Sequence, residues 1–202
     1  IVAGFTRMGA AVVDIEPLEA CRPFQEGSSG FPPGEAAVAF VLSSAPTTPY
    51  AGFLGGAMTN DAYHATGMDP ANTEVIRCVT EALADAGVEP DEIGYLNAHG
   101  TGTAQCDAAE LGLLRDVFGS TKPSIYALKP LVGHCLASAG AVELAAGLLA
   151  YERGVVPASR IVDRAHPQLL DGLSRFEGGV TLKTSMGMGG YNSAVVIGPS
   201  TA

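Results

Sequence analysis

Tryptophan is absent from the 202-residue chain, aromatic residues make up only 6% of it, and 11 basic residues stand against 21 acidic ones. The shortage of Lys and Arg leaves a net charge of −10. It argues against nucleic acid as a main partner, because phosphate binding depends on a surplus of basic side chains. No apolar run is long enough to span a bilayer, since the best candidate, residues 136–150, is interrupted by Glu143. We therefore expect neither a nucleic-acid nor a membrane partner.

Cysteine is also scarce. Cys21, Cys78, Cys106 and Cys135 include no C-x-x-C pair, which argues against a common zinc pattern and against the dense disulfide framework of small secreted domains. The sequence therefore predicts reduced thiols in a cytoplasmic protein, with no metal and no cofactor. A signal peptide and an initiator Met are lacking too, so we expect a fragment of a longer protein.

The chain is rich in hydrophobic residues, at 47% of its length, and this is enough for one domain with a sizeable core. Apolar runs of strand length alternate with segments of helical periodicity. This order predicts an α/β fold with a largely parallel sheet and helices packed on it. The expected strands are residues 35–44, 50–59, 93–98, 124–128, 180–184 and 191–197, and the expected helices are residues 72–86, 106–118 and 138–153.

Polar and glycine-rich segments follow several of these strands. His99 comes directly after the strand 93–98, Lys129 and His134 follow the strand 124–128, and a glycine-rich turn over 187–190 joins the last two strands. Ligands of such sheets bind outside the carboxyl ends of the strands. We therefore expect both imidazoles and the ammonium group to share one pocket beside backbone N–H donors, an arrangement suited to carbonyl and thioester chemistry.

Each of these residues also has a purely structural interpretation. A lone histidine at a strand end is more often structural than catalytic, and Glu110 could complement the dipole of the helix it begins. Cys135 could be a small buried thiol, and Met186 and Met188 could fill gaps in the core. Two glycine-flanked histidines and a lysine at successive strand ends nevertheless favour a site.

Several motifs together resemble one family. Along its length the chain contains C-R-P-F, G-F-P-P-G-E-A-A, N-D-A-Y-H-A-T, then N-A-H-G-T-G-T followed by Asp107 and Glu110, then K-P-L-V-G-H and G-M-G-G-Y-N-S-A-V-V. In this order they resemble the C-terminal half of a β-ketoacyl synthase (ketosynthase) of the thiolase superfamily. The resemblance implies a layered αβαβα fold built from two similar halves. Residues 1–49 would end the N-terminal half, as loops plus one core strand, and residues 50–202 would form the C-terminal half.

The same resemblance implies a reaction and roles for residues. Such enzymes perform decarboxylative Claisen condensation of malonyl and acyl thioesters on acyl carrier protein, in fatty acid or polyketide synthesis. His99 and His134 would be the catalytic histidines and Lys129 would tune them, paired with Glu110. The remaining residues carried over are Thr101 and Thr103 as supporting residues, and Met188, Met186, Gly187 and Gly189 as oxyanion hole and acyl gate.

The chain departs from the family's pattern in one decisive respect. The family's nucleophilic cysteine lies upstream of the matching segment, so this chain would have no nucleophile. We expect it to be inactive alone and to need an N-terminal half or partner chain, with the complete enzyme a dimer. Aromatic residues usual at the glycine-rich turn are replaced by Met186 and Met188, which predicts a different or bulkier acyl chain. Cys135 and Ala36 replace a usual Thr and Gly, with little expected effect.

Two alternatives remain open at this stage. The chain could be a non-catalytic ketosynthase-like partner of the chain-length-factor type, which shapes the dimer and the product tunnel. Such partners usually lose the histidine motifs, and this chain keeps both. A non-decarboxylative thiolase is the other alternative, but the C-x-G motif of that class is absent.

Overall fold

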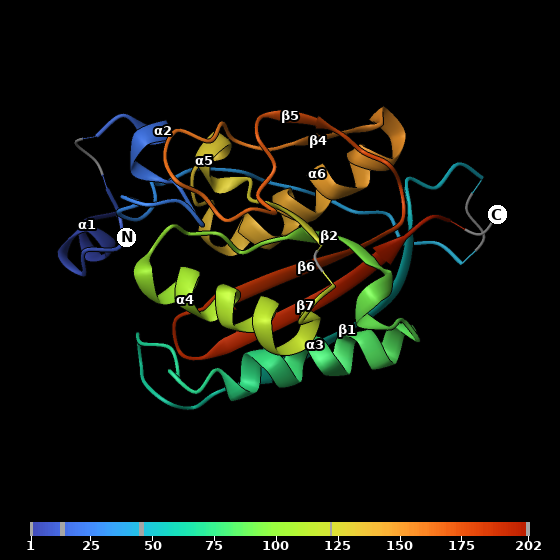
Figure 1. Cartoon of the computed structure of the whole chain (residues 1–202), viewed down its shortest axis with the longest axis horizontal. Helices are drawn as coiled ribbons and strands as arrows, with labels where there is room; N and C mark the ends of the chain where they lie inside the picture. Colours follow the sequence, from blue (N-terminus) through green and yellow to red (C-terminus); the bar gives the residue numbers. More distant parts are fainter. Residues whose placement is uncertain (1, 13–14, 45–46, 122, 201–202) are drawn as a thin grey trace.

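Five strands form one mixed sheet at the centre of the structure, a computed structural model that describes residues 2–12, 15–44, 47–121 and 123–200 (Figure 1). The strand order is β1-β7-β6-β2-β3. β2 pairs in parallel with both β3 and β6, whereas β7 is antiparallel to both β6 and β1. Their bounds are β1 (Gly52–Asn60), β2 (Ile93–Asn97), β3 (Ser124–Tyr126), β6 (Val180–Gly187) and β7 (Tyr191–Gly198).

The sheet is therefore less parallel than the sequence predicted. Four strands share one direction, and β7 alone opposes them, so two of the four neighbouring pairs are antiparallel. The cause is the short turn 188–190 between β6 and β7, because a connection of this length can join only antiparallel neighbours. Gly189 and Gly190 of this turn adopt φ of 85° and 81°, a backbone conformation that glycine adopts without steric penalty.

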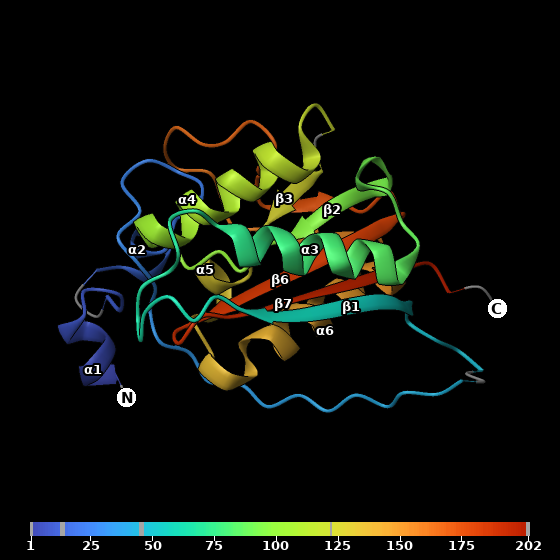
Figure 2. The same ribbon diagram turned by 90° about the horizontal axis from the view of Figure 1, so that it is seen from below.

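Helices cover both faces of the sheet. α3 (Thr73–Ala86) and α4 (Ala104–Leu113) lie on one face and α6 (Ala139–Arg153) on the other (Figures 1 and 2). Gly87 follows α3 and Gly154 follows α6, both in the left-handed conformation that ends many helices. Both helices therefore end at the residues expected from the sequence, 86 and 153. The shorter elements are α1 (Val2–Arg7), α2 (Pro17–Ala20), η1 (Pro90–Glu92), the π-helical turn η2 (Leu114–Phe118), α5 (Lys129–Val132), η3 (Leu136–Ser138), and the two-stranded sheet of β4 (Val155–Pro157) and β5 (Leu173–Arg175).

The main core lies between the sheet and the helices α3 and α4. Leu96, Leu182 and Val196, on β2, β6 and β7, are fully buried there. No helix in the described part of the chain is long and apolar enough to cross a membrane.

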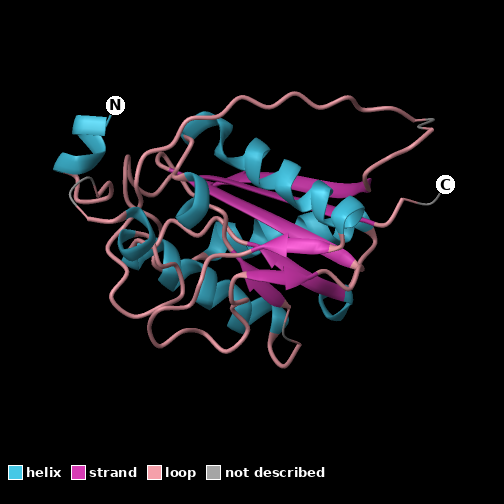
Figure 3. Cartoon of the chain, turned by 90° about the horizontal axis from the view of Figure 1, so that it is seen from above, coloured by secondary structure: helices cyan, strands magenta, loops and turns pink. Residues whose placement is uncertain are grey.

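The predicted strand over residues 35–44 is not formed. This segment has neither helix nor strand structure and runs as a loop outside the layers (Figures 2 and 3). Val41 is 96% exposed and Leu42 is 86% exposed. Hydrophobicity alone supported the prediction, but a buried strand also needs a neighbouring backbone to pair with and a surface to cover it, and the central sheet provides neither here.

Candidate active site at the carboxyl ends of the strands

The two predicted histidines meet at one edge of the sheet. β2 ends at Asn97 and leads into His99, and its parallel neighbour β3 leads through α5 to His134. Because both strands run in the same direction, the segments that follow them lie at the same edge. The centroids of the two imidazole rings are 5.6 Å apart, in an edge-to-face arrangement. The expected convergence of the histidines is therefore present in the structure.

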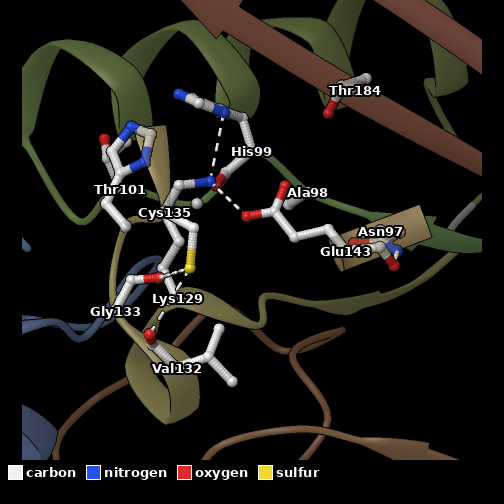
Figure 4. A network of polar contacts seen from close by, with 12 residues as sticks. Asn97, Ala98, His99, Thr101, Lys129, Val132, Gly133, Cys135, Glu143 and Thr184 are labelled. Atoms are coloured by element: carbon white, nitrogen blue, oxygen red, sulfur yellow. Dashed lines mark hydrogen bonds and ion pairs between the residues drawn. The ribbon is translucent and has the colours of Figure 1, made fainter. Parts of the chain in front are cut away.

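Lys129 lies behind His99 and is fully buried. Its Nζ is 3.2 Å from His99 Nδ1, bonds to the carbonyl oxygen of His99, and is 2.5 Å from Glu143 Oε1 (Figure 4). An ammonium group can only donate hydrogen bonds. His99 Nδ1 must therefore accept, and the imidazole proton is on Nε2.

The backbone fixes the orientation of His134. Its Nδ1 accepts a hydrogen bond from the N–H of Leu136 at 3.1 Å, and its ring packs edge-on against Phe31 at 4.6 Å between centroids. Leu136 adopts φ of 53° to make this bond, a left-handed conformation that costs a non-glycine residue about 1–2 kcal/mol. With Nδ1 accepting, the proton of His134 is also on Nε2.

The prediction that Lys129 pairs with Glu110 is wrong. Glu110 Oε1 accepts hydrogen bonds from the N–H of His99 at 2.8 Å and from Thr184 Oγ1 at 3.0 Å, and Oε2 accepts from the N–H of Gly100 at 2.8 Å. The carboxylate of Glu110 thus fixes the backbone of the turn that carries His99. Backbone N–H donors of a tight turn cannot be recognised in a residue pattern, and this is why the sequence suggested the wrong partner.

Glu143 is the actual carboxylate partner of Lys129, and the sequence motifs did not predict it. Lys183 lies on its other side, with Nζ 2.8 Å from Glu143 Oε2. Both side chains are buried, at 1% and 3% exposure. A signal for Glu143 was present, because it is the one charged residue in the otherwise apolar stretch 136–150. A buried carboxylate requires charged partners.

Burial and the two ammonium groups set the protonation of the site. Burial lowers the pKa of His99 well below 6.5, and the charges of Lys129 and Lys183 lower it further. Burial, and then Lys129, lower the pKa of His134 to about 4. Burial raises the pKa of Glu143, but the ammonium groups of Lys183 and Lys129 outweigh burial and lower it. At neutral pH both imidazoles are therefore neutral and the carboxylate is ionised.

A cavity of about 950 Å³ opens in front of the histidines. Lys129 and Glu110 are not among its lining residues and act from behind the histidines. Gly189 is also not in the lining, and its carbonyl oxygen accepts a hydrogen bond from Asn60 Nδ2 at 3.0 Å. All five methionines of the chain contribute to the cavity wall. The predicted site residues in the lining are His99, His134, Thr101, Thr103, Met186, Gly187 and Met188.

The two supporting threonines organise the turn that follows His99. Thr101 Oγ1 and Thr103 Oγ1 are 3.0 Å apart. Thr103 Oγ1 also accepts a hydrogen bond from the N–H of Cys106 at 3.4 Å and so caps the start of α4. Asp107 accepts a hydrogen bond from the N–H of Phe24 at 2.9 Å, and burial raises its pKa to about 7. Asp107 therefore connects the loop around Phe24 to α4, and it also lies in the first turn of this helix.

All four cysteines are buried free thiols. Cys106 lines the cavity, but its Sγ donates to Glu110 Oε2 at 3.4 Å, and burial raises its pKa well above 9.0. Burial also raises the pKa of Cys135, and it raises that of Cys21 to about 12. A nucleophilic cysteine needs a lowered pKa and access to the substrate. None of the four meets both conditions. Within the described ranges no three His, Cys, Asp or Glu residues are grouped so as to hold a metal ion.

Ketosynthases are among the solved structures with the same fold. One is a type II polyketide synthase acyl-carrier protein in complex with its ketosynthase bound to the hexaketide. It matches with a TM-score of 0.83 and 26% identity, over 98% of this chain and 52% of that one. The ishigamide ketosynthase/chain length factor matches with a TM-score of 0.82 and 28% identity, over 98% and 50%. The fold is therefore thiolase-like, and this chain is one of its layered halves.

Sequence comparison identifies the family within this class. The family model "Beta-ketoacyl synthase, C-terminal domain" matches residues 50–163, and the chain belongs to this family. It is 34% identical to 3-oxoacyl-[acyl-carrier-protein] synthase I, chloroplastic, of Hordeum vulgare, over 91% of this chain. It is 32% identical to the tetracenomycin polyketide synthase ketoacyl synthase alpha subunit of Streptomyces glaucescens, over 90% of this chain. The chain spans 42% and 46% of these two relatives.

The lowered pKa of His134 gives a first prediction. The folded chain binds this proton near pH 4 and the unfolded chain near 6.5, so unfolding takes up a proton and stability falls as pH decreases from 6.5 to 4. We expect His134 to titrate near pH 4 by NMR. His134→Gln should remove about 1–2 kcal/mol of this pH dependence, allowing for partial exposure. A titration midpoint of 6.5 or above would contradict the assigned environment.

The buried position of Glu143 gives a second prediction. Glu143→Gln removes the shared partner of two buried ammonium groups and should lower the free energy of unfolding by about 3–5 kcal/mol, measured by denaturant titration. Glu152→Gln is the matched control, because Glu152 is on the same helix in an exposed pair with Arg153. It should change stability by less than about 0.5 kcal/mol. Equal effects of the two substitutions would show that the buried cluster does not hold the fold together.

Proposed function

We propose that this chain is the C-terminal half of a condensing enzyme that performs decarboxylative Claisen condensation of malonyl and acyl thioesters carried on acyl carrier protein. One observation carries the proposal. His99 and His134, 5.6 Å apart, both line the cavity, and each has its Nδ1 engaged by an N–H donor. Each Nε2–H is therefore available to the ligand, and two neutral donors at this separation suit one carbonyl oxygen that gains negative charge.

The chemistry follows from this pair of donors. The thioester carbonyl oxygen of a malonyl group accepts hydrogen bonds from both Nε2 atoms. The bond between the α-carbon and the carboxylate breaks and releases carbon dioxide, and the electron pair forms an enolate that the same donors stabilise. The α-carbon then attacks the carbonyl carbon of an acyl group on a cysteine, and the thiolate leaves. The backbone N–H of Met188, on the turn at the cavity wall, would stabilise that second oxyanion.

The nucleophilic cysteine in this proposal comes from an N-terminal half or partner chain. The four thiols of this chain are buried and have raised pKa values, and the chain spans less than half of the two curated relatives named above. The exposed residues 35–44 fit the same interpretation, since a partner sheet would cover Val41 and Leu42. A dimeric complete enzyme and a cytoplasmic location stay predictions.

A non-catalytic partner subunit is the second candidate function. The solved structures with this fold include a ketosynthase/chain length factor, so both kinds of chain share the architecture. The retained donors to both Nδ1 atoms favour the catalytic interpretation, because a chain that only shapes a tunnel has no need for two oriented imidazoles. The named relatives include enzymes of fatty acid and of polyketide type, and the pathway stays open.

Complementation tests the proposed reaction. The chain, combined with the upstream half that contains the family's nucleophilic cysteine, should decarboxylate malonyl-carrier protein and condense it with an acyl group. His99→Ala and His134→Ala should each lower the decarboxylation rate by about 10²–10³-fold, the effect of removing one oxyanion donor. His166→Ala is the control, since His166 does not line the cavity. Unchanged rates in both site variants would instead favour the non-catalytic partner.

The methionines of the cavity wall predict an adaptable acyl site. Met is unbranched and flexible, so Met186 and Met188 should accept bulkier chains than aromatic residues would. Met186→Phe and Met188→Phe should shift the preference in kcat/KM towards shorter acyl chains by about tenfold, measured with a series of acyl-carrier proteins. Leu173→Phe, at a position 74% exposed, is the control for the added ring. An unchanged preference in both methionine variants would refute this role.

A further inference from the structure

Two lysines converge on one buried carboxylate. Lys129, on α5, and Lys183, on β6, approach Glu143 from different elements, at 2.5 Å from Oε1 and 2.8 Å from Oε2. They are the only lysines in the described part of the chain, since the third, Lys122, is outside it. Lys129 is part of the site that the motifs predicted, whereas no motif drew attention to Lys183.

The buried charges of this region balance only if Lys183 is counted. Four charged side chains are buried together: Lys129, Lys183, Glu143 and Glu110. Thr184, the neighbour of Lys183 on β6, links the cluster to Glu110 through its hydroxyl group. Two ammonium groups against two carboxylates give no net charge, and without Lys183 one negative charge would be left uncompensated. An uncompensated charge is unfavourable at such a depth.

Lys183 also determines how Glu143 meets Lys129. Its Nζ bonds to the carbonyl oxygens of Thr184 and Ala98 and forms an ion pair with Oε2 of the carboxylate. The other oxygen, Oε1, accepts a hydrogen bond from Lys129, whose Nζ keeps a second contact with His99 Nδ1 at 3.2 Å. Without Lys183, both carboxylate oxygens would compete for the Lys129 ammonium group and draw it away from the imidazole.

We propose that Lys183 is a positioning residue of the catalytic histidines: by sharing Glu143 and balancing the charge of Glu110, it holds Lys129 where its ammonium group donates to His99 Nδ1. The proposal rests on the proposed function for its catalytic meaning, but its structural content, the state of the imidazoles, is measurable separately. Lys183 does not line the cavity, so it acts through Lys129 and through its charge and not on the substrate.

The direction of the effect follows from the groups that surround the imidazoles. His99 is faced by Lys129 from α5, Lys183 from β6, Glu143 from α6 and Glu110 from α4, and by the ring of His134. The positive charge of Lys183 contributes to lowering the pKa of both imidazoles. Its removal leaves a more negative surrounding, so both imidazoles should gain protons at higher pH.

The test compares Lys183→Met with the unaltered protein, in the intact protein that contains this chain. Histidine titrations by NMR should show both imidazole pKa values raised by about one unit in Lys183→Met, the scale of one nearby charge. The acid limb of the pH profile of kcat for malonyl-thioester decarboxylation should move up by a similar amount, with KM changed less than about twofold. Arg153→Met, which removes an exposed positive charge, is the control and should shift neither.

A second variant keeps the test decisive if Lys183→Met folds poorly. In Glu143→Gln/Lys183→Met the remaining buried charges, Lys129 and Glu110, balance again. The new amide can accept from Lys129 and donate to the carbonyl oxygens that Lys183 leaves. We expect this double variant to be more stable than Lys183→Met and to have imidazole pKa values nearer those of the unaltered protein. The proposal is overturned if the two variants behave alike, or if Lys183→Met leaves both titrations unchanged.

These outcomes separate the inference from the proposed function. If the unaltered protein decarboxylates no malonyl thioester but its imidazoles still respond to Lys183→Met, the proposed reaction fails and the positioning role stands. If the reaction proceeds and the imidazoles do not respond, the positioning role fails and the reaction stands.

Discussion

One buried carboxylate determines the arrangement of the site. Glu143 is on α6, on the face of the sheet opposite α3 and α4 (Figure 1), and 1% of its surface is exposed. A charge at this depth is stable only when it is paired and hydrogen-bonded, so it draws Lys129 and Lys183 to it from two other elements. Lys129, held in this way, gives its remaining contact to His99. The orientation and protonation of the His99 imidazole therefore depend on the ion pair between Lys129 and Glu143.

The sequence predicted the residues of the site better than the buried charged residues that support them. His99, His134 and Lys129 were found because glycine-flanked polar residues follow buried strands, and parallel strands bring their ends together. Glu110 was given the wrong partner, and Glu143 and Lys183 were missed. Their roles depend on which side chain reaches across the sheet, and this is a three-dimensional property that no local pattern contains. The predicted ends of the helices 72–86 and 138–153, by contrast, were correct, because the glycine that follows each helix acts locally.

The apolar segment 35–44 shows the same limit for the fold. Its composition is typical of a buried strand, yet Val41 and Leu42 are exposed because the central sheet of this chain offers the segment no pairing. A strand forms only when a second backbone pairs with it, and the composition of one segment does not show whether that partner is present. The chain matches just over half of the ketosynthase structure described above, so this mismatch and the lack of an activated cysteine have a common explanation in the proposed second half.

The central claim is that both imidazoles are neutral and carry their protons on Nε2, ready to stabilise an oxyanion together. The ¹⁵N chemical shifts of the histidine side chains at neutral pH measure this directly, because protonated and unprotonated ring nitrogens differ in shift. The account predicts that His99 and His134 are both Nε2–H tautomers. An Nδ1–H tautomer or an imidazolium at either position would contradict it, since that ring could not accept the hydrogen bond that the structure gives its Nδ1.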